Sequence, residues 1–156
     1  MSHHGHGSGI ASASKAHRIL RFVLVGSPNC GKTTLFNALT GLRAKTGNYP
    51  GVTVARYEGR HRVGEADVII EDLPGTYSLE AISPDEEVVS QVLGDGVSVG
   101  SPITGQIVLL DATSLRRSLT LLSHVQQVAR PTLVVLTFTD ELARRGGSID
   151  IKALSR

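Results

Sequence analysis

A glycine-rich loop between an apolar run and a helix-forming stretch dominates the first third of this chain. Residues 26–33 read GSPNCGKT and match the pattern G-x-x-x-x-G-K-[ST]. The apolar run 19–25 before the loop is typical of a buried parallel strand, and a helix is expected over about 32–39. Backbone N–H groups at such a helix start form a nest that stabilises an anion. The loop therefore predicts a phosphate-binding site in an α/β fold.

The residue types of this loop fit the chemistry of a nucleotide phosphate. Gly26 and Gly31 allow a tight turn and a close approach to phosphate oxygens. Lys32 is expected to reach the β- and γ-phosphates, and the Thr33 hydroxyl is expected to ligate Mg²⁺. A chance glycine-rich turn is the alternative, which the complete strand–loop–helix context disfavours. The predicted nucleotide-binding residues here are Gly26, Ser27, Pro28, Asn29, Cys30, Gly31, Lys32, Thr33 and Thr34.

A second short motif, Asp72-Leu73-Pro74-Gly75, follows the strand-like segment VIIED. An aspartate at a strand end can hold Mg²⁺ through water, and the Gly75 N–H can meet a γ-phosphate. On its own the tetrapeptide also fits an ordinary turn. Because it follows a complete phosphate loop, we interpret it as a metal-and-phosphate loop.

Strand-like and helix-like segments alternate along the chain, which predicts an α/β three-layer sandwich with a mostly parallel sheet. Residues 52–62 and 66–72 should pair as a hairpin with Gly64 near the turn. Ser83-Pro84-Asp85-Glu86 is a strong helix start with a capping box. Further strands are expected over 106–110 and 132–136, further helices over 83–94, 114–129 and 141–145 and after Asp150, and loops over 43–52, 72–83 and 94–105.

The composition excludes several classes of protein. The 156 residues, 40% of them hydrophobic, fit one domain with an aliphatic core, and a formal net charge of +2 makes no case for nucleic acid. The single cysteine excludes an internal disulfide framework. No apolar run approaches the ~20 residues of a membrane helix, and no secretory signal is present, so we expect a soluble chain.

The N-terminus differs in composition from the rest. Residues 1–16 are rich in Gly, Ser, His and Ala and are expected to form a disordered leader before a domain over 17–156. His3, His4 and His6 could bind a metal, but no carboxylate or cysteine completes a site. A tag remnant or polar end is the favoured interpretation.

Several segments together resemble the cytoplasmic G domain of ferrous-iron transport protein B. They read GSPNCGKTTLFNALTG, KTGNYPGVTV, EDLPGTYSL, SPDEEV and LLDATSLRRSL, and the likeness runs from about Phe22 to the C-terminus. The combination of GNYPGVTV with DLPGTYSL is quite specific to that family among GTPases. The family's proteins are bacterial and archaeal inner-membrane transporters. Their N-terminal G domain binds and hydrolyses GTP, and a helical regulatory domain and an Fe²⁺-carrying membrane part follow.

This resemblance implies a P-loop, small-GTPase-like fold at the cytoplasmic face of the membrane, with guanine nucleotide as ligand and the transporter's membrane domain as partner. Association between copies of the chain is left open. The family domain continues into a further strand and a Ser-Ala loop over the guanine ring. We therefore expect this chain to lack the last strand and helix of the fold.

Site roles carry over residue by residue. Thr53 matches the first-switch threonine that meets Mg²⁺ and the γ-phosphate, so Mg²⁺ is assigned to Thr33, Thr53 and Asp72. Asn29 matches the asparagine that helps to hold K⁺ in potassium-activated members. The resemblance thus implies a catalytic set of Asn29, Lys32, Thr53 and Gly75. Thr76 stands where many GTPases place a water-positioning glutamine, so slow intrinsic hydrolysis is expected.

The guanine-reading motif departs from the family. It should read Asn-x-x-Asp, and here it reads Thr137-Phe138-Thr139-Asp140. Asp140 can accept two hydrogen bonds from guanine. Thr137 cannot reproduce the contacts of an asparagine amide, so guanine affinity should fall by about 1–3 kcal/mol and specificity could loosen. The alternative interpretation of Asp140 is a helix cap.

Other positions are less informative. Cys30 stands where the family often has serine, and its place at a helix start beside Lys32 should lower its pKa. A redox sensor is conceivable, but a tolerated small residue is favoured. The basic pairs Arg116-Arg117 and Arg144-Arg145 are interpreted as solvated helix faces.

Three functions remain open from the sequence. The first is a GTPase switch that gates a ferrous-iron transporter, in which Mg-GTP orders residues 43–53 and 74–80. The second is a non-catalytic or base-promiscuous nucleotide sensor, which Thr137 and the missing glutamine suggest. The third is another P-loop enzyme, such as a small kinase or ATPase, against which GNYPGVTV and Asp140 argue.

Overall fold

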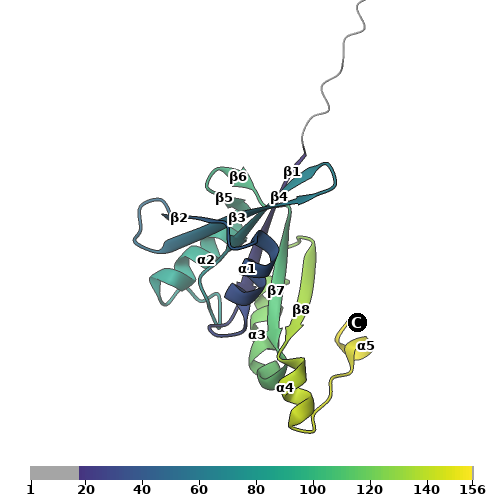
Figure 1. The fold of residues 1–156 in the computed structure, drawn as a ribbon. Coiled ribbons are helices and arrows are strands. Elements are labelled where there is room, and N and C mark those ends of the chain that lie inside the picture. The colour runs from purple at the N-terminus through teal and green to yellow at the C-terminus, as the bar shows by residue number, and fades with distance from the viewer. Residues whose placement is uncertain (1–17, 156) are drawn as a thin grey trace, which may run out of the picture.

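The main sheet is built around the strand that precedes the glycine-rich loop (Figure 1). The computed structural model describes residues 18–155. The strands of the main sheet are β1 (Ile19–Gly26), β2 (Ala44–Asn48), β3 (Ala55–Val63), β4 (Ala66–Asp72), β7 (Gly105–Asp111) and β8 (Thr132–Thr137). They lie in the spatial order β2-β3-β4-β1-β7-β8. The strands β4, β1, β7 and β8 are parallel to one another, and β3 and β2 extend the sheet with antiparallel pairing.

Helices cover both faces of this sheet, as expected of an α/β sandwich (Figure 1). A two-stranded hairpin lies outside the main sheet. The helices are α1 (Lys32–Thr40), α2 (Pro84–Asp95), a 3₁₀ turn (Ala112–Ser114), α3 (Leu115–Val125), α4 (Thr139–Arg144) and α5 (Ile151–Leu154), and the hairpin consists of β5 (Val97–Ser98) and β6 (Ser101–Pro102).

Successive side chains of β1 point to opposite faces of the sheet, and the apolar core is therefore divided into two clusters. Val23 and Val25 point to one face and join buried residues of α2 and α3, whereas Leu24 points to the other and packs with Phe36 of α1. All three β1 side chains are fully buried. Burial of a strand on both faces explains its near-continuous apolar sequence. This core holds the C-terminal end of β1, and hence the loop that follows it, in a fixed place.

Local capping signals gave correct predictions. The Ser83 hydroxyl accepts a hydrogen bond from the Glu86 N–H, and the Glu86 carboxylate accepts one from the Ser83 N–H, which completes the capping box of α2. The Asp150 carboxylate likewise accepts from the Ala153 N–H at the start of α5. Both motifs are satisfied within four residues, so no distant contact is needed to form them.

Two of the predicted loops contain strands. Residues 44–48 form β2, an edge strand whose five residues are all exposed, and the segment 94–105 contains the β5–β6 hairpin. Both predictions were wrong because main-chain pairing holds these strands: β2 has no buried face to impose an alternating pattern, and β5 and β6 are only two residues long, with Ser98 as their one buried residue. The hairpin over 52–72 is confirmed, although β3 begins at Ala55.

Predicted boundaries and faces also need correction. Helix α2 runs to Asp95 with Gly96 as its cap rather than ending at Gly94, and α3 ends at Val125 rather than Ala129. On α3, Leu121, Leu122 and Val125 are buried, whereas Leu119 is 37% exposed. Strand β8 lies at the sheet edge and is only partly buried.

A charged network joins three strands of the sheet. The Arg21 guanidinium on β1 contacts Glu71 on β4 at 2.8 Å and Glu58 on β3 at 3.0 Å, and Arg56 contacts Glu58 at 2.8 Å. Burial opposes ionisation of Glu58, but the hydrogen bonds and charges of Arg21 and Arg56 outweigh it. The pKa of the Glu58 carboxyl therefore lies below its ordinary value.

This lowered pKa predicts a pH-dependent contribution to stability. Since ionisation of Glu58 is favoured in the folded state, its contribution is present above the unfolded pKa near 4.5 and is lost as the pH falls through the folded pKa. We expect Glu58→Gln to lower the unfolding free energy by about 1–2 kcal/mol at neutral pH. The difference from the unmodified protein should shrink near pH ~3.5. Urea unfolding at both pH values measures it, with the exposed Glu80→Gln as control. An equal difference at both pH values would contradict the assignment.

Candidate functional site

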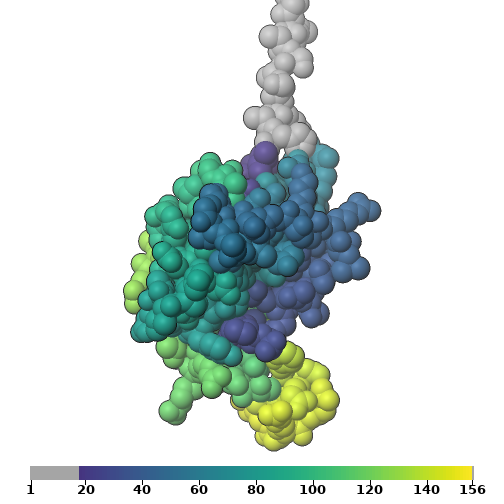
Figure 2. Space-filling model, turned by 90° about the vertical axis from the view of Figure 1, so that its left-hand side faces the viewer, coloured from purple at the N-terminus to yellow at the C-terminus, as the bar shows by residue number. Residues whose placement is uncertain are grey.

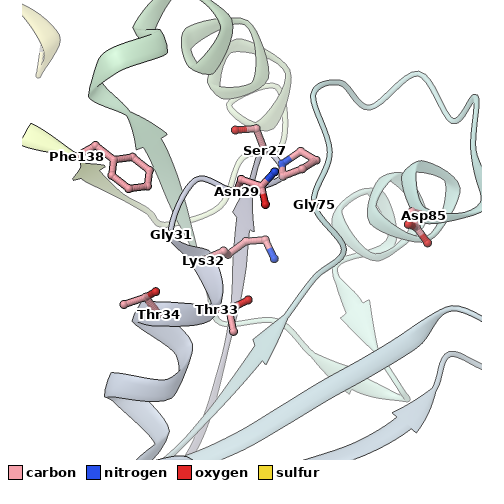
Figure 3. Close-up of a pocket in the computed structure, with 10 residues that line it drawn as sticks. Ser27, Asn29, Gly31, Lys32, Thr33, Thr34, Gly75, Asp85 and Phe138 are labelled. Carbon is pink, nitrogen blue, oxygen red and sulfur yellow. The ribbon is translucent and has the colours of Figure 1, made fainter. Parts of the chain in front are cut away.

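The predicted phosphate loop lines the wall of an open pocket at the C-terminal end of β1. The pocket has a volume of about 620 Å³ (Figure 3). It lies where parallel strands end, the usual ligand position in an α/β sheet. Its lining residues are Ser27, Pro28, Asn29, Gly31, Lys32, Thr33 and Thr34 from the loop and α1, together with Gly75, Asp85 and Phe138.

The backbone of the loop has the conformation that creates a nest of N–H groups. Asn29 has φ 61° and Gly31 φ 90°, both in the left-handed region. The Cys30 N–H donates to the Ser27 carbonyl, which closes the turn. At Gly26, a Cβ atom would lie 2.5 Å from the Cys30 sulfur, so the position has no room for a side chain. The sequence pattern thus follows from the backbone path, which presents N–H groups to the pocket.

The second motif lies directly against this loop. A Cβ atom on Gly75 would lie 3.0 Å from the backbone N and Cα of Pro28. The Thr76 N–H donates to the Gly26 carbonyl at 3.0 Å. The two loops are therefore in backbone contact, which places the Gly75 segment beside the glycine-rich loop.

Lys32 and Asp72 form a buried ion pair between the two motifs. The Lys32 Nζ is 2.5 Å from Asp72 Oδ1, and each side chain is 10% exposed. Lys32 starts α1 and extends toward the segment that carries Gly75 (Figure 3). For the ammonium to bind phosphate oxygens, it must share or exchange its contact with Asp72. The pair therefore places a cation and an anion next to each other between the two motifs.

A second hollow of about 270 Å³ adjoins the first. Lys32, Gly75 and Asp85 line both, and Asp72 lines only the second. The Thr33 hydroxyl and the Asp72 carboxylate are hard oxygen donors that fit Mg²⁺, which takes one or two protein ligands and completes its shell with water and phosphate oxygens. Residues 18–155 contain no group of three or more His, Cys, Asp or Glu side chains that could hold a metal ion.

Thr53 does not line either hollow. It is exposed in the turn 49–54, while its neighbours Val54 and Ala55 line the second hollow. Thr76 is buried, and its hydroxyl donates to the Ser78 carbonyl and accepts from the Ser78 N–H. The hydroxyl of Thr76 is thus occupied within its own loop and does not point to the pocket as a water-orienting group.

The predicted base-reading residues lie beside the pocket rather than in its lining. Thr137 ends β8, and its hydroxyl donates to the Leu110 carbonyl at 3.3 Å. Asp140 is exposed and pairs with Arg144 at 2.6 Å, and this hydrogen bond holds the pKa of its carboxyl below the ordinary value. Because α4 begins at Thr139, Asp140 lies within the helix, and the alternative of a helix cap is wrong.

Sequence reasoning missed two residues of the pocket. Phe138 has φ 55° and a 40% exposed side chain, and its ring lies on the opposite side of the loop from Asp85 (Figure 3). Asp85 is in the first turn of α2. The sequence did mark Asp85 as part of a helix start, and Phe138 as part of the base-reading motif. It gave no sign that either would reach the phosphate loop.

One side-chain prediction is corrected. Cys30 is 1% exposed, and burial raises the pKa of its thiol despite the opposing charge of Lys32, so the expected lowering of this pKa is wrong. Arg117 is exposed on α3, as predicted, and its guanidinium also lies 5.2 Å from the centre of the Tyr77 ring. The leader 1–16, with His3, His4 and His6, lies outside the described residues. Between residues 18 and 155, no helix combines the length and apolarity needed to cross a bilayer.

Comparison with known proteins gives consistent results. Residues 20–156 match the family model described as ferrous iron transport protein B. The Fe(2+) transporter FeoB of Leptospira biflexa is 45% identical over 131 residues, which cover 84% of this chain. The chain spans only 18% of the length of that relative.

Solved structures agree in fold. The G domain of the T. maritima FeoB iron transporter is similar, with a TM-score of 0.79 and 34% identity, over 88% of this chain and 81% of that one. The cytosolic domain of the same transporter in a GDP form has a TM-score of 0.81 and 35% identity, over 88% of this chain and 52% of that one. The α/β fold with a mostly parallel sheet is thereby confirmed.

Proposed function

Since this chain belongs to the ferrous iron transport protein B family, we propose that it binds GTP, hydrolyses it to GDP and phosphate, and acts as a switch in ferrous-iron transport. The T. maritima neighbour is a cytosolic domain in a GDP form, which supports guanine nucleotide as the ligand. The membrane part of a longer protein is the proposed partner, with this domain at the cytoplasmic face of the membrane.

One observation carries the proposal: the glycine-rich nest, Lys32 and the Gly75 segment converge on a single pocket. The nest and the start of α1 provide N–H donors and a favourable dipole for the nucleotide phosphates. Lys32 adds a positive charge that would stabilise the β- and γ-phosphates. This set of groups suits phosphoryl transfer, which depends on positioning and charge stabilisation rather than on covalent chemistry by the protein.

The proposed metal ligands are Thr33, Asp72 and Thr53 for Mg²⁺ and Asn29 for K⁺. Mg²⁺ would supply charge neutralisation between the β- and γ-phosphates, and K⁺ would add the charge that other GTPases take from an arginine. Thr53 is exposed and lines neither hollow, so we expect the 49–54 turn to shift when Thr53 ligates a metal beside Asp72. Thr76 is engaged with Ser78, so orientation of water falls to main-chain groups such as the Gly75 N–H, and turnover should be slow.

Phosphate release from GTP tests the proposal. With Mg²⁺ present, we expect slow turnover that is several-fold faster in KCl than in NaCl, because K⁺ beside Asn29 would stabilise negative charge in the transition state. Asn29→Gly removes the amide but tolerates the positive φ of 61°, so it should remove the difference between the two salts while keeping the loop conformation.

The same measurement distinguishes the GTPase from a second candidate function. A sensor that binds nucleotide without useful turnover is favoured by Thr137, whose hydroxyl is committed to the Leu110 carbonyl, and by the engaged Thr76. Tight GDP and GTP binding without phosphate release in either salt would support the sensor and contradict the enzyme.

A further inference from the structure

A buried carboxylate next to the proposed metal ligand holds the turn that contains Thr53. Glu71 is fully buried on β4, immediately before Asp72. One of its oxygens, Oε1, accepts hydrogen bonds from the Tyr49 hydroxyl and the Ser98 hydroxyl, both at 2.7 Å. The other, Oε2, accepts from Arg21 at 2.8 Å. The carboxylate therefore joins β4, the turn after β2 and the β5–β6 hairpin.

Tyr49 is also the base of the turn itself. Its N–H donates to the Val54 carbonyl at 3.0 Å, and its carbonyl accepts from the Val52 N–H at 3.2 Å. Residues 49–54 thus form a closed main-chain ring, and Thr53 is an exposed member of it. Tyr49 is 5% exposed and Val54 is 8% exposed, so both ends of the ring pack in the core, and Tyr49 adds a side-chain hydrogen bond to Glu71. Burial and the nearby Glu71 carboxylate raise the pKa of the Tyr49 phenol, which keeps the hydroxyl protonated as a donor.

The cavities around the 49–54 ring show which of its residues the Tyr49 anchor does not hold. Pro50 and Val52 line a groove of about 260 Å³ with residues of α2 and the β5–β6 hairpin, whereas Val54 lines the hollow beside Asp72. In the space-filling view, the blue surface of the β2–β3 region adjoins the teal surface of α2 (Figure 2). The ring is therefore anchored at Tyr49 and Val54, and the side chains of residues 50–53 make no buried hydrogen bond.

We infer that Tyr49 is a positioning residue: its hydrogen bond to Glu71 holds the 49–54 ring beside the strand that carries Asp72, and so sets the reach of Thr53 toward the metal position. The inference rests on the proposed function for its catalytic consequence, but the tether itself is independent of it. Deleting the hydroxyl would let the ring open more often and shift over the hollow.

Two matched substitutions test this inference. Tyr49→Phe and Ser98→Ala each remove one hydroxyl donor from the same Glu71 oxygen, but only the first releases the ring. We expect Tyr49→Phe to speed amide exchange at Tyr49 and Val52, measured by NMR without added nucleotide, by about tenfold. Ser98→Ala should leave these two amides unchanged. Equal effects of both substitutions, or none from Tyr49→Phe, would overturn the inference.

The catalytic consequence is measured on the same variants. Tyr49→Phe should lower kcat for GTP by about tenfold while leaving the Kd for GDP within about twofold, because GDP lacks the γ-phosphate that Thr53 would meet. Ser98→Ala should change neither. If unmodified protein releases no phosphate, the proposed function fails, and the exchange measurement alone still decides whether Tyr49 tethers the ring. Faster exchange with unchanged kcat would overturn the positioning role.

Discussion

Replacing Lys32 with alanine is expected to abolish measurable binding of GDP and GTP. The ammonium lies in the pocket wall between the phosphate loop and Asp72, and no other lysine or arginine among residues 18–155 lines that pocket. Charge-assisted hydrogen bonds contribute about 1.5–3 kcal/mol each. Loss of two such bonds to phosphate oxygens would weaken binding roughly 100-fold or more. Isothermal titration with GDP measures the loss, and retained affinity in the variant would refute the proposed site.

The same substitution affects folding, so the design needs controls. It leaves the Asp72 carboxylate, only 10% exposed, without its cation, and an unpaired buried charge destabilises a protein by about 3–5 kcal/mol. Thermal unfolding should therefore accompany the titration. If Lys32→Ala does not fold, Lys32→Met with Asp72→Asn keeps the apolar stem and removes the unpaired charge. Arg62→Ala, an exposed cation at the β3–β4 turn, should leave both stability and binding unchanged.

The proximity of the glycine-rich loop and Asp72 illustrates what sequence reasoning can predict. The loop follows β1 and Asp72 ends β4, and the carboxyl ends of parallel neighbours meet at one edge of a sheet. The helix start at Ser83 was likewise predictable, because all its hydrogen bonds are local. Such features can be predicted because a short sequence pattern is enough to determine them physically.

Other features depend on distant partners or on competing effects. Strand β2 exists through main-chain pairing with β3, and its exposed side chains carry no pattern. The hydrogen bond between Tyr49 and Glu71 joins residues whose proximity only the assembled sheet determines. For Cys30, the sequence shows the neighbouring Lys32 but not the depth of burial, and burial determines the direction of the pKa shift. Predicting these features requires the tertiary structure.

Replacing Thr137 with asparagine is expected to raise guanine affinity by roughly 10- to 100-fold. The Thr137 hydroxyl is committed to the Leu110 carbonyl, whereas an asparagine amide has donors for that carbonyl and a further acceptor and donor for the base. A Cβ on Gly31 would lie 3.6 Å from the Thr137 methyl group, so the side chain at position 137 packs against the phosphate loop. An amide there would stabilise both the loop and the bound base.

Competition of GTP, ATP and XTP against a fluorescent GDP analogue, in KCl with Mg²⁺, measures this effect. GTP should gain over ATP and XTP in Thr137→Asn, because only guanine matches both the new amide and the Asp140 carboxylate. Thr139→Asn makes the same change two residues further along, at the exposed start of α4, and should have no effect. An unchanged order of the three nucleotides would show that Thr137 does not limit base selection. Asp140, which is exposed and forms an ion pair with Arg144, would then be the residue that limits selection of guanine.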